Sequence, residues 1–468
     1  MANIITEAYD PVYRNLVFPL YEGVLRRRGI YRYYRSLSKA PSIPRSELRE
    51  MQRRKLHELL EYCSANVPFY RSLFEEHGVD ASGVYDVEAL RDKGIFTNKR
   101  IVREAGESIL SREFRKEDLP NSATSGSTGS PVLFYMTRDN WCLRVAAKYR
   151  SEDWIGKPLG TPATMIWGHK PGRPRSARIK SSLYWAFQNY QFISAFDIGE
   201  ESLLRHLASI SRHGSRFIES YVTVVYLMAK LIEKRDLQPP KLDGIIVGAE
   251  KLFDFQKEQI ERSFGCRVFN RYGCTEFSNV ASECEGREGL HVNVDNLWVE
   301  VVDEADRPVM GTVGDIVITD LANRAMPLIR YKIGDKGAMT EEICSCGRTF
   351  PMLKEIVGRV SETMKTGDGR EIHDMYFLWK LSRAPGLVRF RVVQDSLAHI
   401  RVEIEHDGSV DREVTTGWIR EALKDLEQYR ISSTLEYVDT IPLTGAGKMR
   451  FFVSELADAS GRAGRDTP

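Results

Sequence analysis

The sequence lacks a long apolar run, a dense set of cysteines and a surplus of charge. No segment offers roughly 18 uninterrupted apolar residues, the length that a membrane-spanning helix needs. The N-terminus "MANIITEAYD" carries acids where a signal peptide carries basic residues. Seven cysteines among 468 residues form no disulfide framework, and a net charge of +2 gives no strong field for nucleic acid. We therefore expect a soluble, cytoplasmic protein that binds no nucleic acid.

A glycine-rich loop also lacks the lysine that a Walker phosphate loop requires. In "SATSGSTGSPVLFY" (122–135), Ser130-Pro131 follows the last glycine in place of lysine and a hydroxyl residue. A dinucleotide-binding fingerprint is absent too. The loop can still offer backbone N–H and hydroxyl donors to phosphate oxygens, from Thr124, Ser125, Gly126, Ser127, Thr128 and Gly129. A plain flexible turn is the alternative, and the cation that a triphosphate needs must come from elsewhere.

Alternating strand and helix patterns predict an α/β fold in two domains. Strand-like runs such as "LDGIIVGAE" alternate with helical patterns such as "DFQKEQIERSFG". The stretch "LWVEVVDEADRPVMGTVGDIVITDL" (297–321) predicts a β-rich subdomain of hairpins. We expect a large multi-sheet α/β N-terminal domain over 1–357 and a small α+β C-terminal domain over 358–468. A helical extension over 1–75 would include an amphipathic helix with Ser46 as its N-cap.

The basic and aromatic cluster "RRRGIYRYYR" (26–35) has two interpretations. It follows the short apolar run "LVFPLYEGVL" (16–25), so one interpretation is contact with an acidic lipid surface. The other is a solvated or self-packed helical face, which explains most runs of this kind. From the sequence we favour the second. A homodimer is also compatible with the sequence.

Six short motifs follow one another along nearly the whole chain: "TSGSTGSP", "GAE", "RYGCTE", "MPLIRYKIGD", "VGR" and "PLTGAGK". By these motifs the sequence resembles the adenylate-forming (acyl-activating, AMP-forming) ligase superfamily, and within it the branch of phenylacetate–CoA ligases and CapK-type capsule-biosynthesis proteins. The pattern between Gln52 and Arg71 also resembles the CapK-type branch. The resemblance implies a small mobile C-terminal domain and an active site between the two domains.

The motif "RYGCTE" would form the centre of a nucleotide site by this resemblance. Tyr272 and Gly273 would lie against adenine, since an aromatic ring can stack on a base. Thr275 would donate to the α-phosphate, and Glu276 would hold Mg²⁺ through oxygen. The alternative is a Tyr-Gly turn that only closes a strand.

Three further positions would border the nucleotide by the same resemblance. Gly248-Ala249-Glu250 ends an apolar strand, where backbone can border both adenine and the acid, although a surface charge explains Glu250 equally well. Asp335 in "RYKIGD" stands where the family carboxylate accepts both ribose hydroxyls. Arg359 in "VGR" would reach ribose or phosphate beside the hinge, where Ser361 replaces the acidic or lysine residue usual at the pivot.

Lys448 would supply the missing cation. In "PLTGAGKM" a glycine turn carries a lone lysine on the small domain. This suits delivery of positive charge to the α-phosphate and the carboxylate during adenylation. Without the other motifs, an exposed turn lysine would be the default interpretation. The resemblance thus explains why the loop at 124–129 carries no lysine of its own.

Four sulfur and nitrogen side chains predict a structural zinc site. Cys344 and Cys346 lie in one turn, and "CEGREGLH" places Cys284 and His291 within reach of each other. Three thiolates and one imidazole suit tetrahedral Zn²⁺. Four protein ligands would leave no open position, so the metal would be structural. The alternatives are reduced thiols in a hairpin, or Cys274 as the fourth ligand.

By the same resemblance the acid would bind against a largely apolar wall that extends to the surroundings of Tyr272, which suits an aryl or other compact acid. We expect the wall to consist of Trp167, Tyr221 and Val222, with His169 near a polar substituent. Core packing is the alternative for each of them.

The implied reaction consumes ATP. The acid would attack the α-phosphate to give acyl-AMP and pyrophosphate, and the acyl group would then pass to the thiol of coenzyme A. An amine or hydroxyl of a sugar or natural product is the alternative acceptor. A non-catalytic nucleotide-binding scaffold at a membrane surface is an interpretation of another class.

Overall fold

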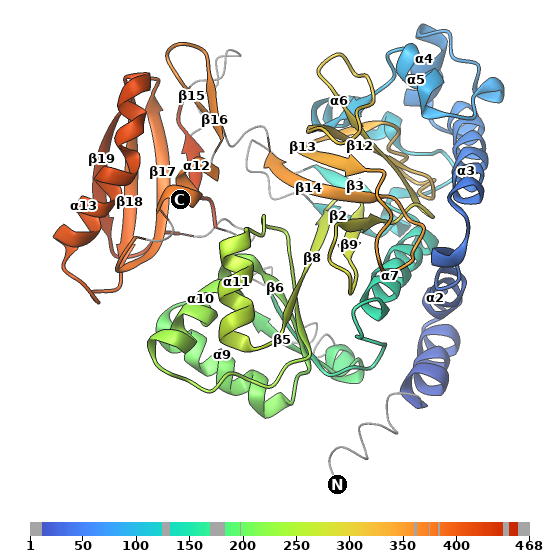
Figure 1. Ribbon diagram of the computed structural model, residues 1–468. Helices are drawn as coiled ribbons and strands as arrows, with labels where there is room; N and C mark the ends of the chain where they lie inside the picture. The colour runs from blue at the N-terminus through green and yellow to red at the C-terminus, as the bar shows by residue number, and fades with distance from the viewer. Residues whose placement is uncertain are drawn as a thin grey trace. The chain divides into compact units, whose positions relative to one another are not determined.

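The computed structural model describes residues 12–123, 132–168, 183–196, 198–359, 363–373, 375–381, 384–442 and 449–456 (Figure 1). The chain falls into two compact units, with the main division after Gly358. Over the described residues, the large unit holds a mixed sheet of twelve strands, and the small unit has a four-stranded sheet of its own.

One half of the large sheet is parallel. Its strands lie in the order β5, β4, β6, β7, β8, and each neighbouring pair runs parallel. Their bounds are Ala163–Trp167 (β4), Tyr190–Ser194 (β5), Phe217–Tyr221 (β6), Gly244–Gly248 (β7) and Arg267–Cys274 (β8). The helices between them are α9 (Glu200–His213), α10 (Val222–Lys234) and α11 (Asp254–Phe264). Every residue of β6 and β7 is buried, as expected for parallel strands covered on both faces.

The other half of the sheet contains the predicted hairpins. From β8 it continues through β9 (Ser278–Glu283), β10 (Leu290–Val292), β14 (Met352–Arg359), β13 (Tyr331–Thr340), β12 (Gly314–Asp320) and β11 (Leu297–Val302). The short β1 (Thr97–Asn98) pairs with β13. β11 and β12 form an antiparallel hairpin with Leu297 opposite Asp320. The hairpin stretch therefore extends the common sheet.

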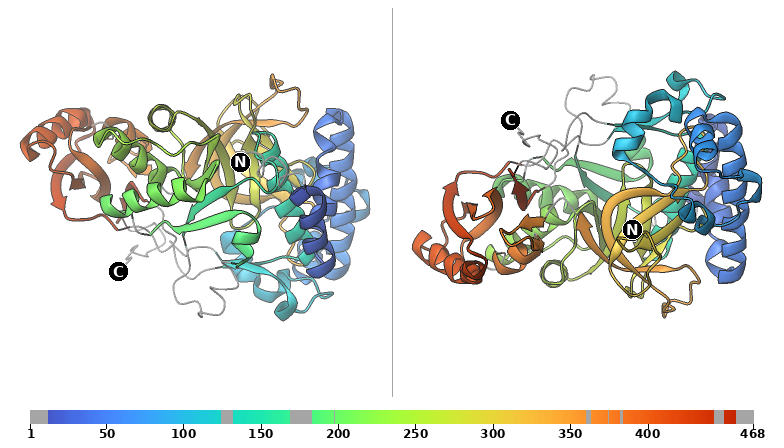
Figure 2. Two further views of the ribbon diagram at one scale, coloured as in Figure 1. Left: turned by 90° about the horizontal axis from the view of Figure 1, so that it is seen from below. Right: turned by 90° about the horizontal axis from the view of Figure 1, so that it is seen from above.

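The N-terminal helices are α2 (Ile30–Leu37), α3 (Arg45–Asn66), α4 (Pro68–Glu76), α5 (Val87–Asp92) and α6 (Lys99–Ala105). Of these helices, α2 and α3 run along one side of the large unit (Figures 1 and 2). α3 buries one face, made of Leu48, Gln52, Leu56, Leu59, Leu60 and Cys63. Its start differs from our prediction: Pro44 precedes the first residue, so Ser46 lies inside the first turn and does not cap the helix. No helix in the described part of the chain is both long and apolar enough to cross a bilayer.

Helix α7 (Arg138–Asp153) is tied to the antiparallel half by buried ion pairs. It begins at Thr137, whose hydroxyl accepts a hydrogen bond from the Asn140 N–H at 3.0 Å. Arg144 pairs with Asp320 and Arg150 with Asp295, both at 2.7 Å. These contacts fix α7 beside the sheet.

The small unit is an α+β structure. Its sheet has the order β19 (Ser432–Val438), β18 (His399–His406), β17 (Leu387–Ser396), β20 (Phe452–Ser454). Its helices include α12 (Met375–Leu381) and α13 (Arg412–Leu423), and a hairpin joins β15 (Thr363–Lys365) to β16 (Glu371–His373). The alternating patterns at 388–394 and 399–406 form β17 and β18. β20 is too short to show in the sequence pattern.

Replacement of Asp153 should change how stability depends on pH. Burial raises the pKa of this carboxyl to about 6, although a hydrogen bond from Tyr34 of α2 at 2.5 Å favours the charged form. A folded pKa above the ordinary value near 3.9 means that stability falls as pH rises from about 4 to 6. We expect Asp153→Asn to gain about 2 kcal/mol relative to the unchanged chain between these limits, measured by urea unfolding.

Asp92→Asn is the matched control, because its side chain is 73% exposed. For Asp92→Asn, the free energy of unfolding should depend on pH in the same way as for the unchanged chain. Equal pH slopes for Asp153→Asn and the unchanged chain would contradict the raised pKa.

Candidate functional site

The predicted pocket residues meet at one edge of the parallel half. Trp167 ends β4, Tyr221 ends β6 and Gly248 ends β7. Tyr221 lies opposite Gly248, and Gly248 lies opposite Arg271 of β8. Ligands of open α/β sheets bind outside the carboxyl ends of the strands. This edge is therefore the candidate site.

Two aromatic rings form one wall at this edge. The rings of Trp167 and Tyr221 lie 4.3 Å apart between centroids, at 32°. Tyr221 is 2% exposed and Val222, the first residue of α10, is 1% exposed, whereas Trp167 is half-buried. Tyr221 and Val222 thus pack in the core, and Trp167 presents the accessible part of the wall.

The segment Gly248-Ala249-Glu250 is a tight turn after β7. A Cβ at Gly248 would lie 2.8 Å from the carbonyl oxygen of Arg271, so the two backbones approach too closely for a side chain. Ala249 has φ of +65°, a strained value for a residue with a Cβ. Glu250 accepts a hydrogen bond from the Thr223 N–H at 2.7 Å, in the first turn of α10. The carboxylate therefore stabilises that helix start.

Tyr272 and Asp335 are in direct contact. The Tyr272 hydroxyl donates to Asp335 Oδ2 at 2.7 Å, which joins β8 to β13. Each residue is 9% exposed. The residues predicted to contact adenine and ribose thus lie together, although they are far apart in the sequence.

The rest of "RYGCTE" forms the turn between β8 and β9. A Cβ at Gly273 would lie 2.3 Å from the carbonyl oxygen of Ser278, so only glycine fits. Glu276 is 7% exposed and accepts a hydrogen bond from the Tyr331 hydroxyl at 3.3 Å. The carbonyl oxygen of Thr275 accepts from the Ser122 hydroxyl at 3.1 Å.

Ser122 links this turn to the glycine-rich loop. It lies on β2 (Asn121–Ala123), which pairs with β3 (Leu133–Tyr135), so the two strands that flank the loop are held together. The bond to Thr275 fixes one of these strands at the nucleotide motif. Several predicted residues lie outside the described residues: Thr124, Ser125, Gly126, Ser127, Thr128, Gly129, His169 and Lys448. Arg359 ends β14, and only its backbone is described.

A buried charge cluster, consisting of Lys148, Glu152, Lys157, Glu219 and Arg271, lies beside this edge. Arg271 donates to Glu219 at 2.6 Å and to Glu152 at 3.1 Å. Lys148 donates to Glu219 at 2.9 Å. Burial opposes ionisation of Glu219, but Lys148 and Arg271 outweigh it and hold its pKa below the ordinary value. Our sequence prediction missed this cluster. The available signal was Glu219, an acid inside the otherwise strand-like run "FIESY", because a buried carboxylate needs a cationic partner.

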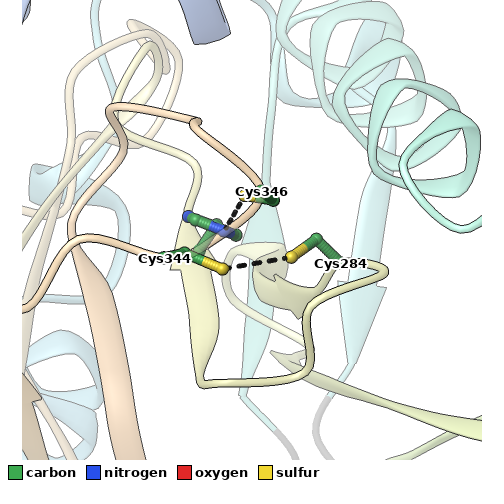
Figure 3. Close-up of side chains that lie close together, drawn as sticks. Cys284, Cys344 and Cys346 are labelled. Atoms are coloured by element: carbon green, nitrogen blue, oxygen red, sulfur yellow. Dashed lines mark hydrogen bonds between the residues drawn. The ribbon is translucent and has the colours of Figure 1, made fainter.

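Four potential metal ligands converge in the large unit (Figure 3). Their ligand atoms all lie within 4.8 Å of one another, on Cys284, His291, Cys344 and Cys346. Cys284 Sγ lies 3.6 Å from Cys344 Sγ, and Cys346 Sγ lies 3.3 Å from His291 Nε2. Cys274 is not a member of the group, so the alternative with that residue as fourth ligand is not supported.

Backbone groups orient these four ligands. His291 Nδ1 lies 3.2 Å from the carbonyl oxygen of Phe350, which places Nε2 toward the sulfur atoms. The Gly286 N–H donates to Cys284 Sγ at 3.3 Å, and the Arg348 N–H to Cys346 Sγ at 3.4 Å. Burial lowers the pKa of His291, which favours the neutral, metal-binding imidazole.

Arg45 holds the loop that carries two of the cysteines. From the first residue of α3 it donates to the carbonyl oxygens of Thr349, Glu341 and Glu342 at 3.0 to 3.2 Å. No pattern in the sequence indicated this contact, because the partners are about three hundred residues away.

Comparisons with known proteins identify the family of the chain. The family model for the CapK C-terminal domain matches residues 364–455. The phenylacetate–coenzyme A ligase of Thermus thermophilus is 30% identical over 344 residues, which cover 69% of this chain and 73% of that protein. Protein CapK of Staphylococcus aureus is 21% identical over 466 residues, across 97% of this chain and 100% of that protein.

Solved structures share the fold. The 2-hydroxyisobutyryl-CoA ligase in the postadenylation state aligns with a TM-score of 0.73 at 19% identity, over 90% of this chain and 92% of that one. An anthranilate CoA ligase in complex with anthranoyl-AMP aligns with a TM-score of 0.53 at 16% identity, over 72% of this chain and 66% of that one. The chain therefore belongs to the adenylate-forming ligases of the phenylacetate–CoA ligase and CapK-like branch, and it is an AMP-forming acid ligase.

Proposed function

We propose that this protein activates an aryl or other compact carboxylic acid with ATP and passes the acyl group to coenzyme A. The contact between Tyr272 and Asp335 at the carboxyl edge of the sheet carries the proposal, because it joins two nucleotide motifs in one place. In the first step a carboxylate oxygen bonds to the α-phosphorus, and the bond to the β-phosphate oxygen breaks to release pyrophosphate. In the second step the thiolate bonds to the acyl carbon and AMP leaves.

The chain's own groups have separate tasks in this proposal. Asp335 accepts the ribose hydroxyls, Tyr272 faces adenine, and Thr275 donates to the α-phosphate. Glu276 is the ligand for Mg²⁺, which neutralises phosphate charge when it is bound. Lys448 supplies positive charge as it develops on the α-phosphate and the carboxylate. The partly accessible ring of Trp167 favours a flat or compact acid.

Two kinds of acceptor for the acyl group are candidates, the thiol of coenzyme A and an amine or hydroxyl. The Thermus relative is named a coenzyme A ligase, which favours the thiol. The similarity to CapK along nearly the whole chain keeps an amine or hydroxyl acceptor as the second candidate. A non-catalytic scaffold has little support, because a binding module needs no transfer lysine in "PLTGAGK".

The first test is ATP–pyrophosphate exchange with a panel of aryl, hydroxyaryl, amino and aliphatic acids. We expect exchange with one class of acid, and a loss of about 100-fold or more in Lys448→Ala, because a charge that acts in the transition state is removed. Lys424→Ala is the matched control, since this lysine is exposed on the small unit. Unchanged exchange in Lys448→Ala would rule out its proposed role, and no exchange with any acid would favour the scaffold.

The second test removes only the Tyr272 hydroxyl. Tyr272→Phe keeps the ring but ends the hydrogen bond to Asp335, so the carboxylate loses its orientation. We expect the KM for ATP to rise by roughly three- to tenfold, the value of one hydrogen bond, with a smaller change in kcat. Tyr437→Phe, which ends a 2.8 Å hydrogen bond to Arg412 in the small unit, is the control. A lower Tm with an unchanged KM for ATP would show that the pair is only structural.

The Cys/His cluster fits a structural zinc ion. With Zn–S bonds near 2.3 Å, two sulfur ligands in a tetrahedron lie about 3.8 Å apart, and the Cys284–Cys344 separation is 3.6 Å. The ion would join the β9–β10 connection, which carries Cys284, to the turn that carries Cys344 and Cys346. Four protein ligands leave no position for substrate, so the ion would stabilise the fold.

Metal analysis of the purified chain tests this assignment. We expect about one zinc ion per chain, lost together with several degrees of Tm in Cys344→Ser. Cys266→Ser should keep the ion, because Cys266 is not among the four ligands. A chain that holds no zinc after growth with added zinc would contradict the assignment.

A further inference from the structure

The helical segment at residues 12–25 exposes a row of large apolar side chains. The row consists of Val12, Leu16, Leu20, Val24 and Leu25, each between 51% and 74% exposed. The segment consists largely of two π-helical stretches, Tyr13–Val17 and Leu20–Leu25. A spacing of four residues is close to one turn of such a helix, which places the first four side chains along one side. Within the described residues, these five are over a third of the exposed large apolar side chains, although the segment is fourteen residues long. Such a concentration marks an interaction site.

The inner face of the segment is fixed, so the row cannot turn inward. Tyr13 and Phe18 are each 1% exposed and pack in one core with Tyr149 of α7. Glu22 is fully buried, where it accepts hydrogen bonds from Tyr184 at 3.1 Å and Arg28 at 3.4 Å. Rotation of the helix would expose the rings of Tyr13 and Phe18 and would separate the Glu22 carboxylate from Tyr184 and Arg28, the two groups that donate to it.

The basic cluster that follows is divided between two tasks. Arg26 lies over the ring of Tyr21, and Arg28 over that of Trp141, so these two half-buried cations pack against the protein itself. Arg27, Arg35 and Lys39 are exposed, and no ion pair involves them among the described residues. Glu22, the sole acid between residues 12 and 40, is buried. Residues 12–39 therefore present an apolar and positive outer surface with no exposed acid of their own.

We propose that residues 12–39 form a docking surface for an anionic lipid bilayer, with the apolar row at the acyl boundary and Arg27, Arg35 and Lys39 at the headgroups. This inference does not depend on the proposed function. An exposed apolar row followed along the chain by cations without ion pairs is the combination that binds acidic membrane surfaces. A second copy of the chain fits less well, because a twofold contact would bring the same cations face to face.

Flotation of the full chain with lipid vesicles tests the proposal. We expect binding to phosphatidylcholine vesicles that contain about one quarter phosphatidylglycerol, and binding at least about tenfold weaker to phosphatidylcholine alone. Added salt should weaken the binding, because it screens the cations. Equal binding to both vesicles, or none to either, would overturn the proposal.

Two sets of substitutions locate the contact. Leu16→Ser with Leu20→Ser and Val24→Ser should abolish flotation, as should Arg27→Gln with Arg35→Gln and Lys39→Gln. Met310→Ser with Val313→Ser and Val414→Ser is the control, since these residues are 48% to 53% exposed elsewhere. Tm and acid-dependent pyrophosphate exchange in solution should stay unchanged in all three. Flotation that survives the first two sets would overturn the proposal, as would a dimer in sedimentation that the Leu16 set dissociates.

Discussion

Strand β8 pairs in parallel with β7 on one edge and antiparallel with β9 on the other, and the candidate site depends on this change of direction. The change requires a turn so tight that a Cβ at Gly273 would meet the Ser278 carbonyl oxygen. The turn puts Tyr272 and Glu276 on either side of the change, and both contact β13, through Asp335 and Tyr331. The nucleotide motifs converge because the sheet itself brings them together.

Buried ionic groups hold the surroundings of this turn in place. Arg271 precedes Tyr272 in β8, and its ion pairs with Glu152 and Glu219 connect α7, β6 and β8. Buried pairs of this kind contribute little net stability, but loss of one partner leaves a costly uncompensated charge. They therefore restrict the packing of α7 to one arrangement. In the antiparallel half, the Cys/His cluster and the contacts of Arg45 similarly restrict the position of the loop that carries Cys344 and Cys346.

Sequence reasoning worked where the chemistry of one residue type is decisive. Sulfur and imidazole donors are few, so the predicted group of Cys284, His291, Cys344 and Cys346 comes together as expected. It worked less well where burial decides the role. Tyr221 packs in the core, and Glu250 stabilises the start of α10. Both residues therefore have a structural role, whether or not they also contact the substrate. A residue type does not reveal which neighbours will cover it.

The sequence by itself determined the α/β class, because hydrophobic periodicity and local turn chemistry depend on near neighbours. It also carried the family resemblance, through the identity and order of its six motifs. Only the tertiary structure decided which distant groups meet. The buried charge cluster takes its members from α7, β6, β8 and the chain after α7, and Arg45 reaches carbonyl oxygens beyond residue 340. The exposed apolar row at 12–25 likewise became visible only once Tyr13, Phe18 and Glu22 were buried. Such contacts depend on strand register and helix packing across the whole chain, which no local pattern encodes.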